Sequence, residues 1–269
     1  MVAGRRQDQM PIFDPIKLAK RIVADVQDYS LLAWQSVANI FSRPRYLAET
    51  LHQADLIGVG SLPVVILTGL SVGAVLALQS ANSLARFGAL SFTGQFISLS
   101  MVRELGPVLT ALMVAGRNAS GMASELGSMK VTEQIDAMRA LGTDPSKKLV
   151  TPRVVSTVVM LFFLTIISNF VGLCGGSLVS VLMLRLDFNQ YWTSAWQSLA
   201  FADVFMGLTK PLVSGYIIAT IGCHYGLTAK GGTQGVGRAT TQAVVAASVL
   251  ILILDFFVTR FLMAFTPVK

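Results

Sequence analysis

The sequence predicts an all-α integral membrane protein, in which one amphipathic helix is followed by five transmembrane helices. Of the 269 residues, 53% are hydrophobic and only 13% are charged, and the mean hydropathy is +0.64, which is typical of membrane proteins. Residues 56–85 and 154–184 contain no charged side chain, and each run exceeds the roughly 20 residues that a helix needs to cross a bilayer. These runs are continuously apolar, whereas the strands of a membrane barrel alternate between apolar and polar residues. A β-barrel is therefore not predicted.

The first 55 residues are predicted to form a cytoplasmic or interfacial segment. Apolar residues recur there near helical spacing, with charged residues between them. The apolar positions are Ile12, Ile16, Ala19, Ile22, Val23, Val26, Leu31 and Trp34. We expect an amphipathic helix that lies along the inner leaflet; a plain solvated helix is the alternative. No apolar core precedes a small-residue cleavage site, so no secretory signal is predicted.

Three further spans are predicted at residues 94–118, 204–228 and 242–265. All three are apolar but interrupted by charge. The charged residues are Arg103, Glu104 and Arg117 in the first, Lys210 in the second, and Asp255 and Arg260 in the third. Together with the two uncharged runs they give five transmembrane helices in a single membrane domain, residues 56–269.

The distribution of Lys and Arg predicts the orientation. Of the 21 basic residues, seven precede residue 56, five lie in residues 119–153 and two in residues 229–241, whereas the connections on the other side carry only Arg86 and Arg185. Cytoplasmic loops are enriched in Lys and Arg. The N-terminus is therefore expected in the cytoplasm and the C-terminus outside, and the net charge of +7 indicates anionic lipid, not nucleic acid, as the partner.

No constellation for bond chemistry is visible in the sequence. Cys174 and Cys223 stand apart within apolar runs, so neither a disulfide nor a metal site is predicted. The glycine-rich stretch 231–239 differs from a phosphate-binding loop, because Arg238 and Ala239 replace the required Lys and Ser or Thr. We expect it to be a flexible cytoplasmic turn after which Thr240 and Thr241 help to start the last helix.

Four charged residues inside predicted spans are candidate functional residues. A charged side chain near the bilayer centre costs at least about 2.5–3.5 kcal/mol, so it usually faces a partner charge or a wet cavity. The four, Arg103, Glu104, Lys210 and Asp255, cancel formally. Adjacent positions on a helix point about 100° apart, so Arg103 and Glu104 are expected to pair with other helices. A structural ion-pair network and a role in gating or in holding a lipid headgroup both remain open.

Helix-breaking and small residues mark further positions in the spans. Pro107 is predicted to kink its helix and to free a carbonyl about four residues earlier. Gly69 and Gly73 form a G-x-x-x-G motif, which lets helices approach closely. Packing within one chain and dimerisation are both compatible with this motif.

The connection from about residue 120 to residue 152 is too long for a simple turn between spans. It contains a predicted helix, 121–141, with apolar anchors interleaved with charges. The candidate contact residues are Glu125, Met129, Lys130, Glu133, Gln134, Asp136, Met138 and Arg139. A mixed, partly acidic face is poorly suited to anionic lipid, so we expect this helix to dock into a groove of a cytoplasmic protein.

Five motifs in these same regions resemble the MlaE family of ABC transporter permeases. They are RELGP at 103–107, AGR at 115–117, ELGSM at 125–129, VTEQIDAM at 131–138 and GVGRATT at 235–241. The resemblance covers roughly residues 12–265. Asn118 and Met138 are small departures from the family pattern and leave the assignment intact.

The resemblance implies a lipid transporter of the bacterial envelope, in the inner membrane of a Gram-negative bacterium. It implies two copies of this permease, two cytoplasmic ATPase subunits that bind ATP and magnesium, a periplasmic ring of MCE-domain protein and, often, a small STAS-domain subunit. It also implies that the helix at 121–141 couples to the ATPase. This chain would carry no cofactor and perform no bond chemistry; a membrane enzyme acting on lipid and an ion-gradient-driven carrier are the alternatives.

Overall fold

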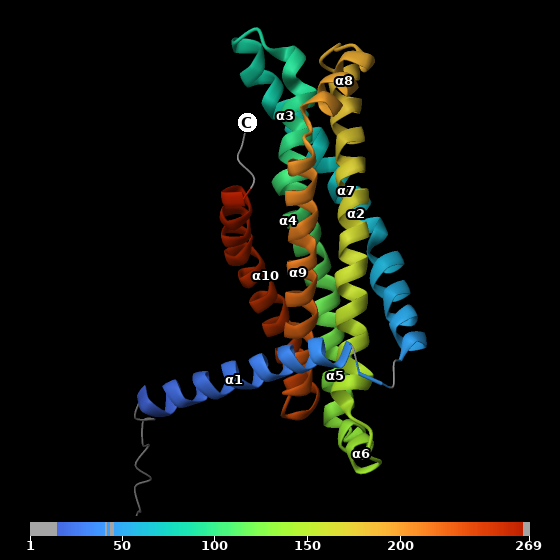
Figure 1. Cartoon of the computed structure of the whole chain (residues 1–269), viewed down its shortest axis with the longest axis vertical. Coiled ribbons are helices and arrows are strands. Elements are labelled where there is room, and N and C mark those ends of the chain that lie inside the picture. Colours follow the sequence, from blue (N-terminus) through green and yellow to red (C-terminus); the bar gives the residue numbers. More distant parts are fainter. Residues whose placement is uncertain (1–14, 41, 44–45, 266–269) are drawn as a thin grey trace, which may run out of the picture.

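The computed structural model describes residues 15–40, 42–43 and 46–265. All secondary-structure elements in these residues are helices. Five helical stretches are long and apolar enough to cross a membrane (Figure 1). They are Leu47–Arg86, Leu90–Val131, Ser146–Leu182, Phe201–Leu227 and Gly232–Ala264. The predicted fold class, a helix followed by five potential spans, is therefore confirmed.

The first span is α2 (Leu47–Arg86), which begins before the predicted residue 56. The third span joins a short π-helical turn, η4 (Ser146–Val150), to α7 (Thr151–Leu182). The fourth is α9 (Phe201–Leu227) and the fifth is α10 (Gly232–Phe265). At one end of the bundle α8 (Phe188–Ser198), which the sequence did not reveal, packs against the start of the second span (Figure 1).

The second span is a continuous helical stretch in which α-helical segments alternate with π turns. A 3₁₀ turn, η1 (Leu90–Phe92), leads into it. Its successive pieces are α3 (Thr93–Ser100), the π turn η2 (Met101–Leu105), α4 (Gly106–Val114), the π turn η3 (Ala115–Ala119) and α5 (Ser120–Val131). The Gly106 N–H donates to the Met101 carbonyl five residues earlier. This wider turn accommodates Pro107, which supplies no N–H, without ending the helix.

The helix predicted at 121–141 is divided in two. Its first half is α5, the direct continuation of the second span, and its second half is α6 (Gln134–Ala140). The break lies at Thr132 and Glu133, where Glu133 adopts the left-handed conformation with φ 60°. The predicted span boundary near Asn118 is thus not an end of the helix.

The glycine-rich stretch 231–239 is not the flexible turn that the sequence predicted. Gly231 and Gly232 take positive φ values of 91° and 66°, a conformation that costs glycine little, and reverse the chain at once. Because α10 begins at Gly232, Thr240 and Thr241 lie two turns inside the helix, where both side chains donate to the Gly237 carbonyl.

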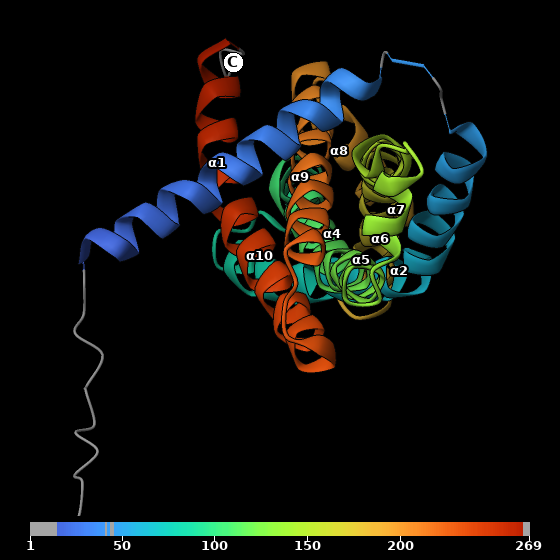
Figure 2. The same cartoon turned by 90° about the horizontal axis from the view of Figure 1, so that it is seen from below.

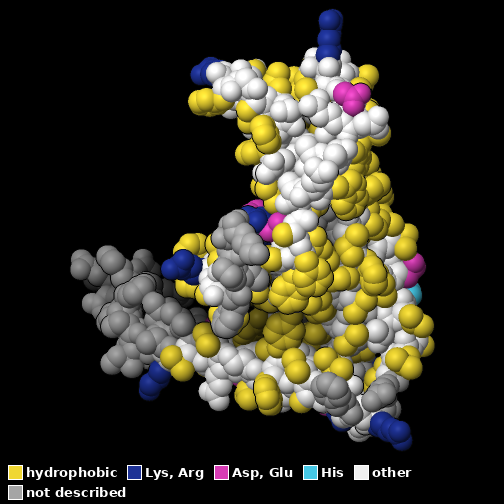
Figure 3. Space-filling model, turned by 45° about the horizontal axis from the view of Figure 1, so that its top comes forward, with side chains coloured by type: hydrophobic (Ala, Val, Ile, Leu, Met, Phe, Trp, Pro, Cys, Tyr) yellow, Lys and Arg dark blue, Asp and Glu magenta, His cyan; other side chains and the backbone are white. Residues whose placement is uncertain are grey.

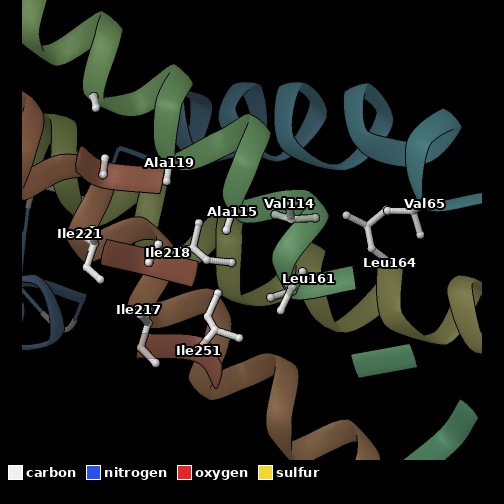
Figure 4. Packing of buried hydrophobic residues seen from close by; sticks show 14 residues of the cluster. Val65, Val114, Ala115, Ala119, Leu161, Leu164, Ile217, Ile218, Ile221 and Ile251 are labelled. Atoms are coloured by element: carbon white, nitrogen blue, oxygen red, sulfur yellow. The ribbon is translucent and has the colours of Figure 1, made fainter. Parts of the chain in front are cut away.

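The centre of the bundle is apolar and receives side chains from all five spans. Val65 of α2, Val114 of α4, Leu161 of α7, Ile218 of α9 and Ile251 of α10 are all buried in one cluster (Figure 4). The outer surface of the bundle is also largely hydrophobic, as Figure 3 shows for one face. An apolar interior inside an apolar surface is what a bilayer environment requires.

The helix α1 (Pro15–Ile40) crosses the end of the bundle at a steep angle to the spans (Figures 1 and 2). Two hydrogen bonds tie it to α9: the Tyr29 and Thr220 hydroxyls lie 3.0 Å apart, and the Tyr216 hydroxyl donates to the Ala33 carbonyl at 2.8 Å. Its apolar residues Val23 and Trp34 are exposed. The predicted anchor Ile12 lies outside the described residues.

The G-x-x-x-G motif packs α2 against α7 within the chain. A Cβ atom at Gly69 would lie 2.9 Å from the Ser168 carbonyl oxygen, and one at Gly73 would overlap the Gly172 carbonyl oxygen. Both glycines are buried. Close packing inside one chain is therefore the use that the structure makes of this motif.

We expect Gly73→Ala to lower the free energy of unfolding by about 1–3 kcal/mol, because the added methyl group forces two backbones apart. Thermal unfolding of the purified protein in detergent measures the effect. Gly116→Ala is the matched control, since a Cβ atom there meets nothing within 4 Å and alanine favours the helix. Equal unfolding temperatures for the two variants would contradict the packing role of Gly73.

Candidate functional site

A cluster of charged side chains connects three of the spans inside the bundle. Arg103 lies in the π turn η2, and its Nε atom donates to Oδ1 of Asp203 on α9 at 2.7 Å. The Asp203 side chain is 4% exposed, and its other carboxylate oxygen accepts the Ala200 N–H at 2.9 Å. A buried, charge-assisted pair of this kind fixes the second span against the start of the fourth.

Lys210 lies at the centre of the second half of the cluster. Its ammonium group pairs with Glu104 of η2 and lies 3.2 Å from Oδ1 of Asp255 on α10. The Lys210 side chain is only 2% exposed, whereas those of Glu104 and Asp255 are 41% and 19% exposed. One cation that is withheld from solvent thus holds carboxylates from two other helices.

The prediction that Arg103 and Glu104 pair with other helices and not with each other is confirmed. All four residues singled out in the sequence belong to one arrangement, and the structure adds Asp203 as the fifth member. Charged side chains of both signs meet inside an otherwise apolar surface in Figure 3. Because Lys210 contacts two carboxylates, movement of α10 relative to η2 would change which of them it holds.

The predicted contact residues near the other end of the bundle have two different surroundings. Glu125 on α5 reaches Arg153 on α7 at 2.7 Å, and the Arg153 side chain is 1% exposed and also donates to the Leu149 carbonyl at 2.8 Å. Met129 and Met138 pack partly buried against the core around Ile135. These residues anchor α5 and α6 to the bundle.

A small ion-pair cluster joins α5 to α6 across the break at Glu133. Lys130 lies 2.8 Å and Arg139 lies 3.1 Å from the Asp136 carboxylate. The hydrogen bond from Lys130 holds the pKa of Asp136 below its ordinary value. These two ion pairs therefore stabilise the packing of α6 against α5 at neutral pH. Their contribution is lost only as the pH falls through the lowered pKa of Asp136.

Glu133 and Gln134 are exposed at the tip between the two helices. Neither side chain has a partner in the part of the chain that the structure describes. Leu141, which follows α6, is 83% exposed. Glu133 and Gln134 at the start of α6 and Leu141 just after its end are therefore available to another protein, and we refer to these three residues as the α6 tip. The side chains of Glu125, Asp136 and Arg139 are also about half exposed but are held in ion pairs.

Residues 50–261 match the family model described as Permease MlaE. The chain belongs to the MlaE permease family. It is 45% identical over 246 residues to a probable ABC transporter permease protein of Rickettsia conorii, a match that covers 91% of this chain and 94% of the relative. It is 36% identical over 208 residues to the intermembrane phospholipid transport system permease protein MlaE of Haemophilus influenzae, covering 77% of this chain and 80% of that protein.

A third relative is chloroplastic. The protein trigalactosyldiacylglycerol 1 of Arabidopsis thaliana is 38% identical over 231 residues, which cover 86% of this chain and 66% of the plant protein. As an MlaE permease the chain is the membrane subunit of an ABC transporter, a class whose ATPase is a separate partner. It is not itself an enzyme, and permease subunits of this family carry no cofactor.

Proposed function

We propose that this permease moves phospholipid, or a similar lipid, between a bacterial inner membrane and the periplasm or outer membrane, and so maintains the lipid asymmetry of the envelope. The name of the Haemophilus relative, an intermembrane phospholipid transport system permease, supports this substrate class. The naming of the plant relative after a diacylglycerol lipid supports it independently.

The observation that carries the proposal is the unequal burial of the spans. Within an apolar 18-residue segment of each span, only 28% is buried in α2 and 17% in α10, compared with 56% in α9. Large side chains such as Leu67 and Phe256 are more than half exposed on these two spans. Apolar surface of this extent fits lipid and a second copy of the chain.

In the proposed mechanism two copies enclose a lipid cavity that is lined by the first, second and fifth spans. Arg103, Glu104, Lys210 and Asp255 lie near this cavity and act as a gate or as a headgroup contact. The Lys210 pairs link the second and fifth spans, so opening the cavity would break one of them. The gate is thereby coupled to the arrangement of the helices.

The motor is the partner ATPase, which binds ATP and magnesium. We propose that it contacts residues 121–141, with the α6 tip on its surface. Because α5 continues the second span without a break, a displacement of α6 that the Asp136 ion pairs transmit to α5 would reach the π turn that carries Arg103 and Glu104. Fourteen of the 21 basic residues precede residue 56 or lie in residues 119–153 and 229–241 of the sequence, which supports a cytoplasmic N-terminus and a periplasmic C-terminus.

The remaining proposed partners are a periplasmic MCE-domain ring protein and a STAS-domain subunit beside the ATPase. Membrane lipids surround the assembly, which we place in the inner membrane of a Gram-negative bacterium. The exposed apolar residues of α1 support its position along the inner leaflet.

Affinity purification of the tagged permease from its native membrane tests the proposal. We expect an ATPase subunit to copurify and mass spectrometry to detect phospholipid in the purified complex. A stable complex that hydrolyses ATP but neither contains nor moves phospholipid would overturn the proposed substrate. Purification of a fully active carrier without any ATPase would overturn the proposed mechanism.

A further inference from the structure

Resting on the proposed function, we propose that Arg260 is the phosphate anchor of a phospholipid site between α9 and the C-terminal end of α10. The site lies beside the charge cluster but shares no residue with it. It would hold one lipid molecule by its headgroup phosphate, with the acyl chains against the apolar walls.

The first observation is a hollow of about 870 Å³ at this place. Thr209 and Val213 of α9 line it on one side, and Phe257, Val258 and Met263 of α10 contribute to the other. Toward its C-terminal end α10 diverges from α9 in both views of the fold (Figures 1 and 2). The volume of the hollow is within the usual range of about 300–1,000 Å³ for ligand sites.

The second observation is that, among the described residues that line the hollow, Arg260 is the single charged one. The other cations of the predicted spans 94–118, 204–228 and 242–265 have protein partners: Arg103 pairs with Asp203, Lys210 pairs with Glu104 and Asp255, and Arg117 donates to the Gly60 carbonyl. Within the described residues, Arg260 has neither an ion pair nor a hydrogen bond. Arg260 is exposed, so its guanidinium group is available to an anion from outside the chain.

The third observation is the position of Arg260 along the helix. It follows Asp255 by five residues, which places it about 7.5 Å further along the helix axis, toward the end remote from α1 (Figure 1). Arg260 lies in the last two described turns of α10, which is described as far as Phe265. Arg260 is therefore at the level where a lipid phosphate meets the hydrocarbon region, and a guanidinium group binds phosphate with two parallel hydrogen bonds.

Photoaffinity labelling of the whole transporter complex in nanodiscs tests the site. Two probes with identical photoactivatable acyl chains are compared, a phosphatidylglycerol and a diacylglycerol that lacks the phosphate, and the labelled peptides of α10 are quantified by mass spectrometry. We expect the phospholipid probe to label the segment around Phe257 about tenfold more than the diacylglycerol, the ratio that one charge-assisted contact provides.

Arg260→Gln is expected to reduce phospholipid labelling to the diacylglycerol level, and Arg260→Lys to retain most of it. Arg86→Gln is the matched control, because Arg86 is an exposed arginine at the C-terminal end of α2 that does not line the hollow. Copurification of the ATPase subunit with each variant confirms that the complex is assembled.

Equal labelling by the two probes, or labelling that Arg260→Gln leaves unchanged, would overturn the site. Lipid would then contact the hollow only through its acyl chains, without recognition of the phosphate. Crosslinks from this segment to another protein chain in place of lipid would overturn it as well. Either result leaves the proposed function standing if the complex still moves phospholipid, whereas a complex that moves none refutes the proposed function independently of Arg260.

Discussion

Replacing Lys210 with methionine is expected to abolish lipid transport and to destabilise the protein by about 3 kcal/mol. Methionine preserves the apolar stem but leaves the Asp255 carboxylate and Glu104 without their cation. Removal of one member of a buried ion pair costs about 3–5 kcal/mol, and the partial exposure of Glu104 places the effect at the lower end of this range. Thermal unfolding in detergent and transfer of fluorescent phospholipid between liposomes measure the two effects.

Lys230→Met is the control for this variant, since Lys230 is an exposed lysine in the turn between α9 and α10. Glu104→Gln separates stability from transport, because Glu104 is partly exposed and its neutral isostere leaves Lys210 paired with Asp255. A Glu104→Ala, Lys210→Ala double variant that transports lipid at the normal rate would show that the cluster has only a packing role.

The charge cluster could be predicted from the sequence except for Asp203. A charge inside an apolar run is visible without a structure, and helix geometry alone excluded a pair between Arg103 and Glu104. Asp203 was missed because hydropathy placed the start of the fourth span at residue 204, so this aspartate seemed to lie outside the membrane. In the structure α9 begins at Phe201, which brings Asp203 into the first turn and next to Arg103.

The ends of the helices were harder to predict than their existence. Hydropathy reports where apolar residues stop, whereas a helix ends where its backbone hydrogen bonds stop. After Asn118 the composition becomes polar, but nothing interrupts the backbone until Thr132 and Glu133, so the second span continues as α5. The pairing of helices that are distant in sequence, such as α2 with α7, depends on shape at Gly73 and Gly172, and one sequence does not record it.

Glu133→Lys is expected to weaken binding of the partner ATPase about tenfold, or ~1.4 kcal/mol, and to lower lipid-stimulated ATP hydrolysis to a similar degree. Glu133 is exposed at the α6 tip, and its side chain has no hydrogen bond or ion pair within the described residues. Reversal of its charge therefore leaves the permease folded while it places a like charge against a surface selected for an acidic one. The copurified ATPase-to-permease ratio and the ATPase rate measure the effect.

Asp136 distinguishes an effect on the partner from an effect on the fold. The double reversal of Glu133 and Asp136 to Lys is expected to abolish coupling, but Asp136 also holds Lys130 and Arg139, so part of that loss would come from separation of α6 from α5. Asp55→Lys is the surface control, since Asp55 is an exposed carboxylate on the N-terminal part of α2 that has no partner within the described residues. If Glu133→Lys retains normal ATPase binding and hydrolysis while Asp136→Asn loses both, α6 acts through its attachment to the bundle and the α6 tip is not the contact.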